Sequence, residues 1–322
     1  MKFTFILSVF LVSLTTHAQV DTYQETLESC RLIQNNQERL KCYDGIDSAF
    51  ISNIQVEQVS QEGVQQSINQ KKTIPVLLAD LEEPRIFSAI GQLTFLDKQI
   101  NSILLGVGAR LKMKSFEFND SNNMIDFNFI TLIKSQFDVD EIDTRNNRGG
   151  ALINTDFMLG GELVKPYDFG YLRLRYSHKS THLGDEFLID NPEYLKERLN
   201  LSYETVDFLA YRNMNNWGGY IGASAIVRSE PGDLENFQMQ TGLQYKGVKR
   251  QWFTPIIGID FKSWQASNWH LNTSLKAGLE YSGFLDQPLQ FMLEYYDGKS
   301  PYGQFFNEDL EFFGFSVNHY WH

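Results

Sequence analysis

The stretch Leu271-Asn-Thr-Ser-Leu-Lys-Ala-Gly-Leu-Glu-Tyr281 decides the fold, because apolar and polar residues alternate along it without a break. Side chains of a β-strand point to opposite faces in turn, so this pattern predicts a strand with one apolar and one polar face. Half-buried strands of soluble sheets usually show about four to eight such residues. A run of about ten is the length that crosses a membrane as a tilted barrel strand.

The same alternation recurs from residue 74 to the C-terminus, in runs separated by polar connections. It predicts an all-β fold, a transmembrane antiparallel β-barrel of about twelve strands over residues 74–322, and an even number is usual in bacterial single-chain barrels. The three longest connections, at 135–151, 179–197 and 297–310, follow odd-numbered strands, which fits strands that run outward from a periplasmic N-terminus. The predicted strands are 85–95, 103–113, 124–134, 152–163, 168–178, 198–210, 218–228, 237–246, 255–263, 271–281, 289–296 and 311–321.

The residues before the barrel carry the signs of export. Lys2, the apolar run 3–14 and the small residues that follow predict a signal peptide over residues 1–18. Helical spacing predicts a short periplasmic helical hairpin at 19–52, and the non-periodic stretch 53–73 is predicted to be a linker. No stretch reaches the roughly 18 apolar residues of a membrane-spanning helix, so export without a helical anchor is expected.

The composition fits a barrel of the bacterial outer membrane. Aromatic residues make up 14% of the chain, whereas the mean hydropathy is slightly negative. Aromatic girdles combined with a polar interior give a barrel this profile. The net charge of −12 argues against nucleic acid as a partner. The two cysteines, Cys30 and Cys42, are expected to form a disulfide across the helical hairpin in the oxidising periplasm.

Charged side chains fall on the polar face of the predicted strands, which faces the lumen. Both signs are present, and because unpaired buried charges are costly, we expect a packed, salt-bridged interior and not an open pore. Arg173 and Arg175 alternate with leucines and are expected to point inward. Their candidate partners are Asp156, Glu162 and Glu204. The predicted lumenal charges are Arg110, Lys112, Asp126, Asp156, Glu162, Arg173, Arg175, Arg198, Glu204, Asp260, Lys262, Lys276, Glu280 and Glu294.

One cluster of chemically capable side chains follows the strand that carries these two arginines, in Tyr176-Ser-His178-Lys-Ser180-Thr-His182-Leu-Gly-Asp185-Glu186. His178 and Ser180 share the parity of the leucines and are expected to face lipid at the outward end of the strand. A nucleophilic hydroxyl needs a base within reach and a third group that orients the base. Ser180, His178 and Glu197 are therefore the candidate nucleophile, base and orienting acid of an acyl hydrolase. The alternative is a strand end at the polar interface, without chemistry.

The end of the same cluster offers a second kind of site. His182, Asp185 and Glu186 supply one imidazole and two carboxylates, which are ligands that a divalent cation accepts. The sequence therefore predicts a candidate metal site on this loop. The alternative is a solvated acidic loop that turns at Gly184.

Three separated segments carry a resemblance to a known family, namely Ala79–Arg85, His178–Glu186 and Glu294–Phe305. In this order they are similar to the motifs of an uncharacterised bacterial family, domain of unknown function 1207, over about residues 74–322. The resemblance implies an outer-membrane β-barrel and no established activity.

The segment Cys30–Asp44 and the pair His178-x-Ser180 carry a weaker resemblance, to outer-membrane phospholipase A. Those enzymes have a lipid-facing His-x-Ser at the outer end of one strand and an Asn on the next strand. Here Glu197 stands nearest to the position of that Asn, and Thr181-His182 replaces the Asn-Gly that follows the serine in the family. The resemblance implies hydrolysis of outer-leaflet phospholipid, with a divalent cation such as calcium as a cofactor whose ligands the sequence does not map.

Three function classes follow from these observations. The first is a barrel with a structural or binding role, the second is a phospholipase A-like hydrolase, and the third is a small-solute channel. The expected location is the bacterial outer membrane, with the N-terminal segment in the periplasm. The expected partners are outer-membrane lipid and, during biogenesis, the barrel-assembly machinery, since the aromatic end of the last strand, Tyr320-Trp321, resembles the ends that this machinery recognises.

Overall fold

The computed structural model describes residues 35, 37, 39, 42, 74–118, 120–140, 150–192, 194, 201–232, 234–283 and 287–321. Twelve antiparallel strands dominate this part of the chain. They are β1 (Ile86–Phe95), β2 (Lys98–Phe118), β3 (Asp120–Asp138), β4 (Ala151–Tyr167), β5 (Gly170–Leu183), β6 (Ser202–Met214), β7 (Trp217–Glu230), β8 (Phe237–Lys246), β9 (Phe253–Trp264), β10 (His270–Tyr281), β11 (Leu289–Lys299) and β12 (Asp309–His319). The connections hold a short helix, α5 (Asp185–Asp190), and two 3-10 turns, η1 (Gln265–Ser267) and η2 (Gly303–Phe305).

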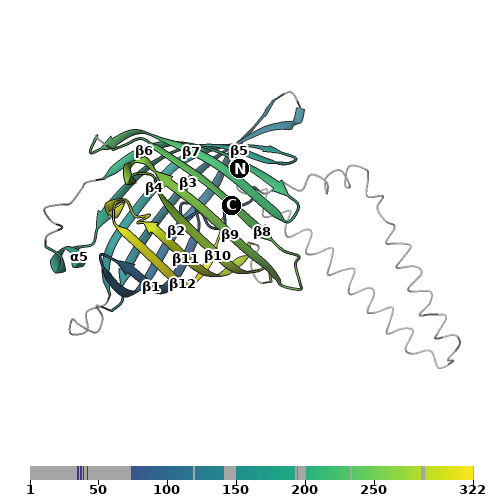
Figure 1. The fold of residues 1–322 in the computed structure, drawn as a ribbon. Coiled ribbons are helices and arrows are strands. Elements are labelled where there is room, and N and C mark those ends of the chain that lie inside the picture. Colours follow the sequence, from purple (N-terminus) through teal and green to yellow (C-terminus); the bar gives the residue numbers. More distant parts are fainter. Residues whose placement is uncertain are drawn as a thin grey trace, which may run out of the picture. The chain divides into compact units, whose positions relative to one another are not determined.

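The strands close into a barrel in chain order, and β1 pairs with β12 to complete the ring (Figure 1). Closure leaves no strand edge unpaired, which a barrel in lipid requires. Gly91 of β1 lies opposite Gly314 of β12 at this seam. A Cβ atom at Gly91 would lie 2.2 Å from the carbonyl oxygen of Phe313, so the close approach of the two strands depends on glycine. The predicted all-β barrel of about twelve strands is confirmed.

Burial alternates along the strands as the period-two pattern predicts. On β5, Arg173 and Arg175 are buried in the lumen, whereas Leu174 and Tyr176 are exposed on the outer wall. Most of the predicted lumenal charges are likewise buried. Arg198 lies outside the described residues, and the lumenal assignment of Glu204 is wrong for a reason given with the site below.

The hairpin of β2 and β3 is longer than predicted. Its pairing continues to Glu117 and Met124, so most of the stretch 114–123, which was not predicted as strand, is strand. A register shift between Lys112 and Lys114 leaves an extra residue at Met113. Such a bulge reverses the parity of the residues that follow, which hides the continuation from a period-two reading of the sequence.

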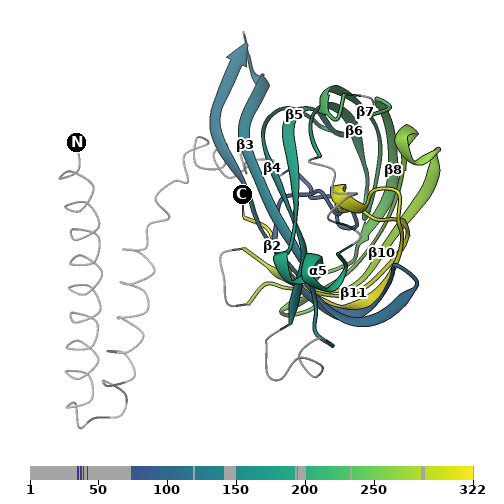
Figure 2. The same ribbon diagram turned by 90° about the vertical axis from the view of Figure 1, so that its left-hand side faces the viewer.

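Two segments that are not strands fill the interior of the barrel. We call residues 74–85, which precede β1, the plug segment, and residues 300–308, between β11 and β12, the inner loop. Both lie within the ring of strands (Figure 2). The plug segment buries Leu77 completely, and the inner loop packs Tyr302 and Phe305 into the largest apolar cluster. The lumen is therefore packed, as expected, although neither segment was predicted to fill it.

A charge network joins the plug segment to the strands. Glu83 of the plug lies 2.8 Å from Arg110, 3.0 Å from Arg173 and 3.5 Å from Arg175. Glu162 of β4 also contacts Arg110 and Arg175. Burial raises the pKa of Glu83, but the neighbouring guanidinium groups outweigh this and hold the pKa below its ordinary value. Glu83 is therefore ionised and holds the plug to three buried arginines.

The two ends of the barrel differ in their connections. We call the end where β1 begins and β12 ends the terminal end, and the opposite end the loop end. The connections at the loop end include 139–150, 184–201 and 300–308, whereas the turns at the terminal end are mostly shorter. This asymmetry is the one predicted for an outer-membrane barrel.

The predictions for the N-terminal unit fall almost wholly outside the described residues. They are the signal peptide at 1–18, the helical hairpin at 19–52 and the linker at 53–73. Cys30 also lies there, so its disulfide with Cys42 stays a prediction. No helix in the described part of the chain is both long enough and apolar enough to cross a membrane.

Candidate functional site

His178 and Ser180 lie on the outer wall of β5, near its loop end. Successive side chains of a strand point to opposite faces. The even-numbered residues here therefore face outward, and the odd-numbered Arg175, Ser177 and Thr181 are buried inside. The side chain of His178 is 49% exposed. The predicted placement of the histidine and the serine on one face is thus reproduced. Between these two described side chains the structure shows no hydrogen bond, although such bonds in hydrolases often tighten only when substrate binds.

The carboxylate next to His178 belongs to Glu204 of β6. The two residues are direct cross-strand partners, and Nδ1 of His178 lies 3.4 Å from Oε1 of Glu204. The Glu204 side chain is largely buried on the outer wall, at 18% exposure, and Arg228 of β7 lies 4.0 Å from it on the other side. An imidazole held against a carboxylate in this way has one nitrogen oriented by the acid and the other available for a proton.

The sequence had placed Glu204 in the lumen, and the structure corrects this. The prediction took Leu201 as an outward-facing residue of a strand beginning at 198. Leu201 instead packs inside the barrel against Tyr203 and Phe306, and β6 begins only at Ser202. Every position of β6 near its start therefore has the opposite parity, and Glu204 faces outward. Glu197, the predicted orienting acid, lies outside the described residues.

The inward-facing side chains of the same stretch of β5 are held by hydrogen bonds inside the barrel. The Lys179 ammonium donates to Glu82 of the plug segment at 2.6 Å, and the Thr181 hydroxyl donates to Asp156 of β4 at 2.6 Å. Asp156 also accepts from the backbone N–H of Gly303 in the inner loop, at 3.0 Å. Residues 179 and 181 are thus held from inside, while 178 and 180 carry the outward groups. Rigid support of this kind is what a catalytic pair needs.

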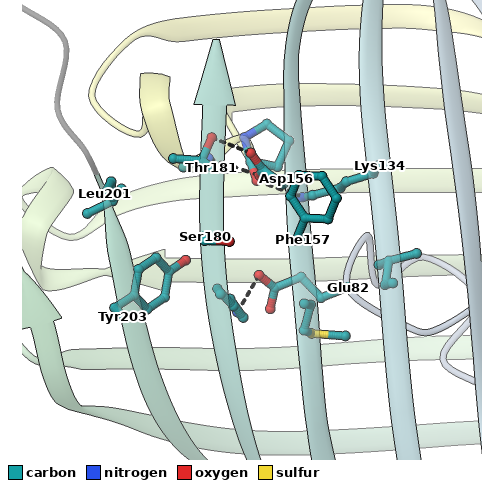
Figure 3. A pocket seen from close by; sticks show the side chains of 13 residues that line it. Glu82, Lys134, Asp156, Phe157, Ser180, Thr181, Leu201 and Tyr203 are labelled. Carbon is teal, nitrogen blue, oxygen red and sulfur yellow. Dashed lines mark hydrogen bonds and ion pairs between the residues drawn. The ribbon is translucent and has the colours of Figure 1, made fainter.

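A cavity of about 380 Å³ lies at this wall, lined by residues of β3 to β6, the plug segment and the inner loop. Figure 3 shows the side chains that line it, with Ser180 next to Thr181 on β5 and a dashed line between Thr181 and Asp156. The cavity therefore adjoins the strand that carries the outward site, and its polar groups are largely paired with one another.

The structure does not bring the three predicted metal ligands together. The His182 ring packs on Phe157, with ring centroids 5.7 Å apart. Asp185 and Glu186 instead occupy the first turn of α5. In the described part of the chain no three His, Cys, Asp or Glu side chains form a group that could hold a metal ion. These residues do not fit a calcium site in this arrangement, and no catalytic step below is routed through a metal.

The sequence reading did not find the roles of Glu82, Glu83 and Glu204. The first two belong to the segment Ala79–Arg85, whose three acids fall within four residues of a chain region without periodicity. That concentration of acids, matched by arginines on the lumenal faces of the strands, is the one sequence signal that could have indicated a lumenal partner. The outward position of Glu204 could have been predicted only from the correct start of its strand, at Ser202.

The closed ring of twelve membrane-length strands, with an apolar outer wall and a packed polar lumen, defines a β-barrel of the outer-membrane class. The chain belongs to the family described as protein of unknown function (DUF1207), whose model matches residues 65–322. A search of curated proteins gives no match to this sequence.

Solved structures with a similar fold are outer-membrane barrels. Outer membrane phospholipase A from Escherichia coli is 11% identical, with a TM-score of 0.50 over 78% of this chain and 93% of that chain. The calcium-bound outer membrane phospholipase dimer of Salmonella typhi is 11% identical, with a TM-score of 0.49 over 78% and 94%. A KdgM porin in complex with disordered oligogalacturonate is 9% identical, with a TM-score of 0.42 over 74% and 99%. At these identities the likeness concerns the fold alone.

Proposed function

We propose that this protein is an acyl hydrolase of the phospholipase A type that acts on lipid at the outer wall of its own barrel. Ser180 is the nucleophile, His178 the general base and Glu204 the orienting acid. The observation that carries the proposal is the position of His178, which stands opposite Glu204 at 3.4 Å and two residues from Ser180 on the same lipid-facing wall. Glu204 takes the role that the sequence had given to Glu197.

The proposed orientation puts this site at the outer leaflet. If the N-terminal unit is periplasmic, the terminal end faces the periplasm and the loop end faces outward. His178 and Ser180 lie near the loop end of β5, which would place them at the depth of the outer-leaflet ester groups. A phospholipid in that leaflet therefore approaches the serine sideways, from the membrane, and not through the lumen.

The chemistry proceeds as an acyl transfer through a covalent intermediate. The Ser180 Oγ attacks the carbonyl carbon of a glycerol ester as His178 Nε2 takes its proton, and Glu204 stabilises the imidazolium through Nδ1–H. The C–O bond to the glycerol oxygen then breaks, and His178 returns the proton to that oxygen. Water hydrolyses the acyl-serine by the reverse sequence of proton transfers, releasing a fatty acid and restoring the hydroxyl.

The lumen supports this proposal over a small-solute channel. The plug segment and the inner loop occupy the interior, and buried pairs such as Arg110–Glu83 and Lys179–Glu82 connect the plug segment to the strands. A channel for solutes needs a continuous polar path, which usually takes more strands or an unfilled lumen. The proposed site of His178, Ser180 and Glu204 faces lipid and not the lumen.

The first experiment is fatty-acid release by the wild-type protein. Full-length protein refolded in detergent is mixed with phospholipid micelles, once with calcium and once with a chelator. We expect release above that of a heat-denatured sample in at least one condition, because the refolded barrel alone holds β5 and β6 in register. Background release in both conditions contradicts the hydrolase and leaves a barrel with a structural or binding role.

A further inference from the structure

A second cavity, of about 630 Å³, lies inside the barrel at its loop end and is separate from the outward site. We call it the mouth cavity. It is walled by the loop-end parts of β6 and of β8 to β11 and is bounded on one side by the inner loop. Its aromatic walls are Tyr203, Trp264, Tyr296, Tyr302 and Phe306.

Four polar side chains that line the mouth cavity have no hydrogen-bond partner among the described residues. They are Tyr203 and Gln238, each 9% exposed, and Ser274 and Tyr302, each 4% exposed. None of the four is among the polar side-chain atoms that are closed off from solvent without a partner, so their donors and acceptors are open to the cavity, where water or a ligand can pair them. Hydroxyl and amide groups both donate and accept, which suits a ligand that does the same.

The charged groups of the cavity are already matched by the protein. The Lys262 ammonium donates to Asp80 at 2.9 Å and to Glu82 at 3.3 Å. Asp260 accepts hydrogen bonds from Tyr220 and from Gln240, both at 2.7 Å. Glu82 is also paired with Lys179 at 2.6 Å, so a charged ligand would find no unmatched counter-charge in this cavity. The groups left for a ligand are neutral.

The aromatic walls form a continuous apolar surface beside these neutral polar groups. The Trp264 ring lies 4.9 Å from the ring of Phe306 and 5.9 Å from that of Tyr203, measured between centroids. A sugar ring has an apolar C–H face that packs on such rings and a rim of hydroxyls that donate and accept. We propose that the mouth cavity binds one neutral sugar residue, with Gln238 and Ser274 on its hydroxyls and Trp264 against its face.

The test measures binding of neutral monosaccharides to the full-length refolded protein. Glucose, galactose and mannose, and choline as a cationic probe, are each titrated by calorimetry and by saturation-transfer NMR. The detergent has a polyoxyethylene head group, so its head group brings neither a sugar nor an ammonium group that could compete for the cavity. We expect saturable binding of at least one sugar. Because Gln238→Leu removes hydrogen bonds without changing the size of the side chain much, it should weaken that binding by about five-fold.

The matched control is Gln92→Leu, since Gln92 is an exposed glutamine on the outer wall of β1, away from the cavity. It should bind the sugar as the wild type does, and both variants should keep the wild-type melting temperature within a few degrees. The proposal is overturned if no sugar saturates, or if both variants bind equally. Saturable binding of choline without binding of any sugar would also overturn it, because that result identifies a cation site. Fatty-acid release plays no part in these readouts, so the outcome is independent of the hydrolase.

Discussion

Ser180→Ala and His178→Ala are each expected to lower phospholipid hydrolysis by at least about a thousand-fold, because nucleophile and base act as one unit. Loss of either leaves no route for the proton of the attacking hydroxyl. Glu204→Ala should cost less, since the imidazole can still accept a proton without being oriented. The measurement is the initial rate of fatty-acid release from mixed micelles.

Two control variants test whether these losses are specific. Ser88→Ala removes an exposed hydroxyl from the outer wall of β1, and His270→Ala removes an exposed imidazole at the start of β10. Both should keep the wild-type rate. A Ser180→Ala protein with full activity would rule out the assignment, whatever the other variants do.

Glu83→Gln is expected to lower the free energy of unfolding by about 3–5 kcal/mol, the cost of leaving buried charges without their partner. Glu83 is completely buried and contacts three arginines, with Glu162 as the remaining carboxylate in contact with two of them. The substitution keeps the shape of the side chain and removes its charge. Three guanidinium groups then share a single acid in a poorly hydrated lumen.

Thermal and urea unfolding in detergent measure this effect. Glu117→Ala is the control, since Glu117 is an exposed acid of the long hairpin. It should leave the free energy of unfolding within about 0.5 kcal/mol of the wild type. An unchanged midpoint for Glu83→Gln would mean that the plug segment does not depend on this network. That result would also weaken the argument that the lumen is closed.

The barrel could be predicted because each of its strands carries its own sequence pattern. A strand that has lipid on one side and a polar lumen on the other must alternate, and runs such as Leu271–Tyr281 record this directly. The inward position of Arg173 and Arg175 and the outward position of His178 follow from the same parity. Where a bulge or a strand start breaks the parity, as at Met113 and at Leu201, the reading failed.

The plug segment could not be predicted in the same way. Its residues have no periodicity, and their partners lie far away in the sequence, as the contact of Glu82 with Lys262 shows. A local pattern carries no information about which acid meets which base across a lumen. The acid next to His178 could not be predicted for the same reason, because the choice between Glu197 and Glu204 depends on the cross-strand register of β5 and β6.

Covalent labelling tests whether Ser180 is a nucleophile that His178 activates on the outer wall. A lipid-like fluorophosphonate transfers its phosphonyl group to an activated serine hydroxyl with loss of fluoride, and mass spectrometry of the digested protein locates the adduct. We expect a single adduct on Ser180 in the wild type and none in His178→Ala. An unlabelled Ser180 in a correctly refolded barrel, or equal labelling with and without the histidine, would contradict it.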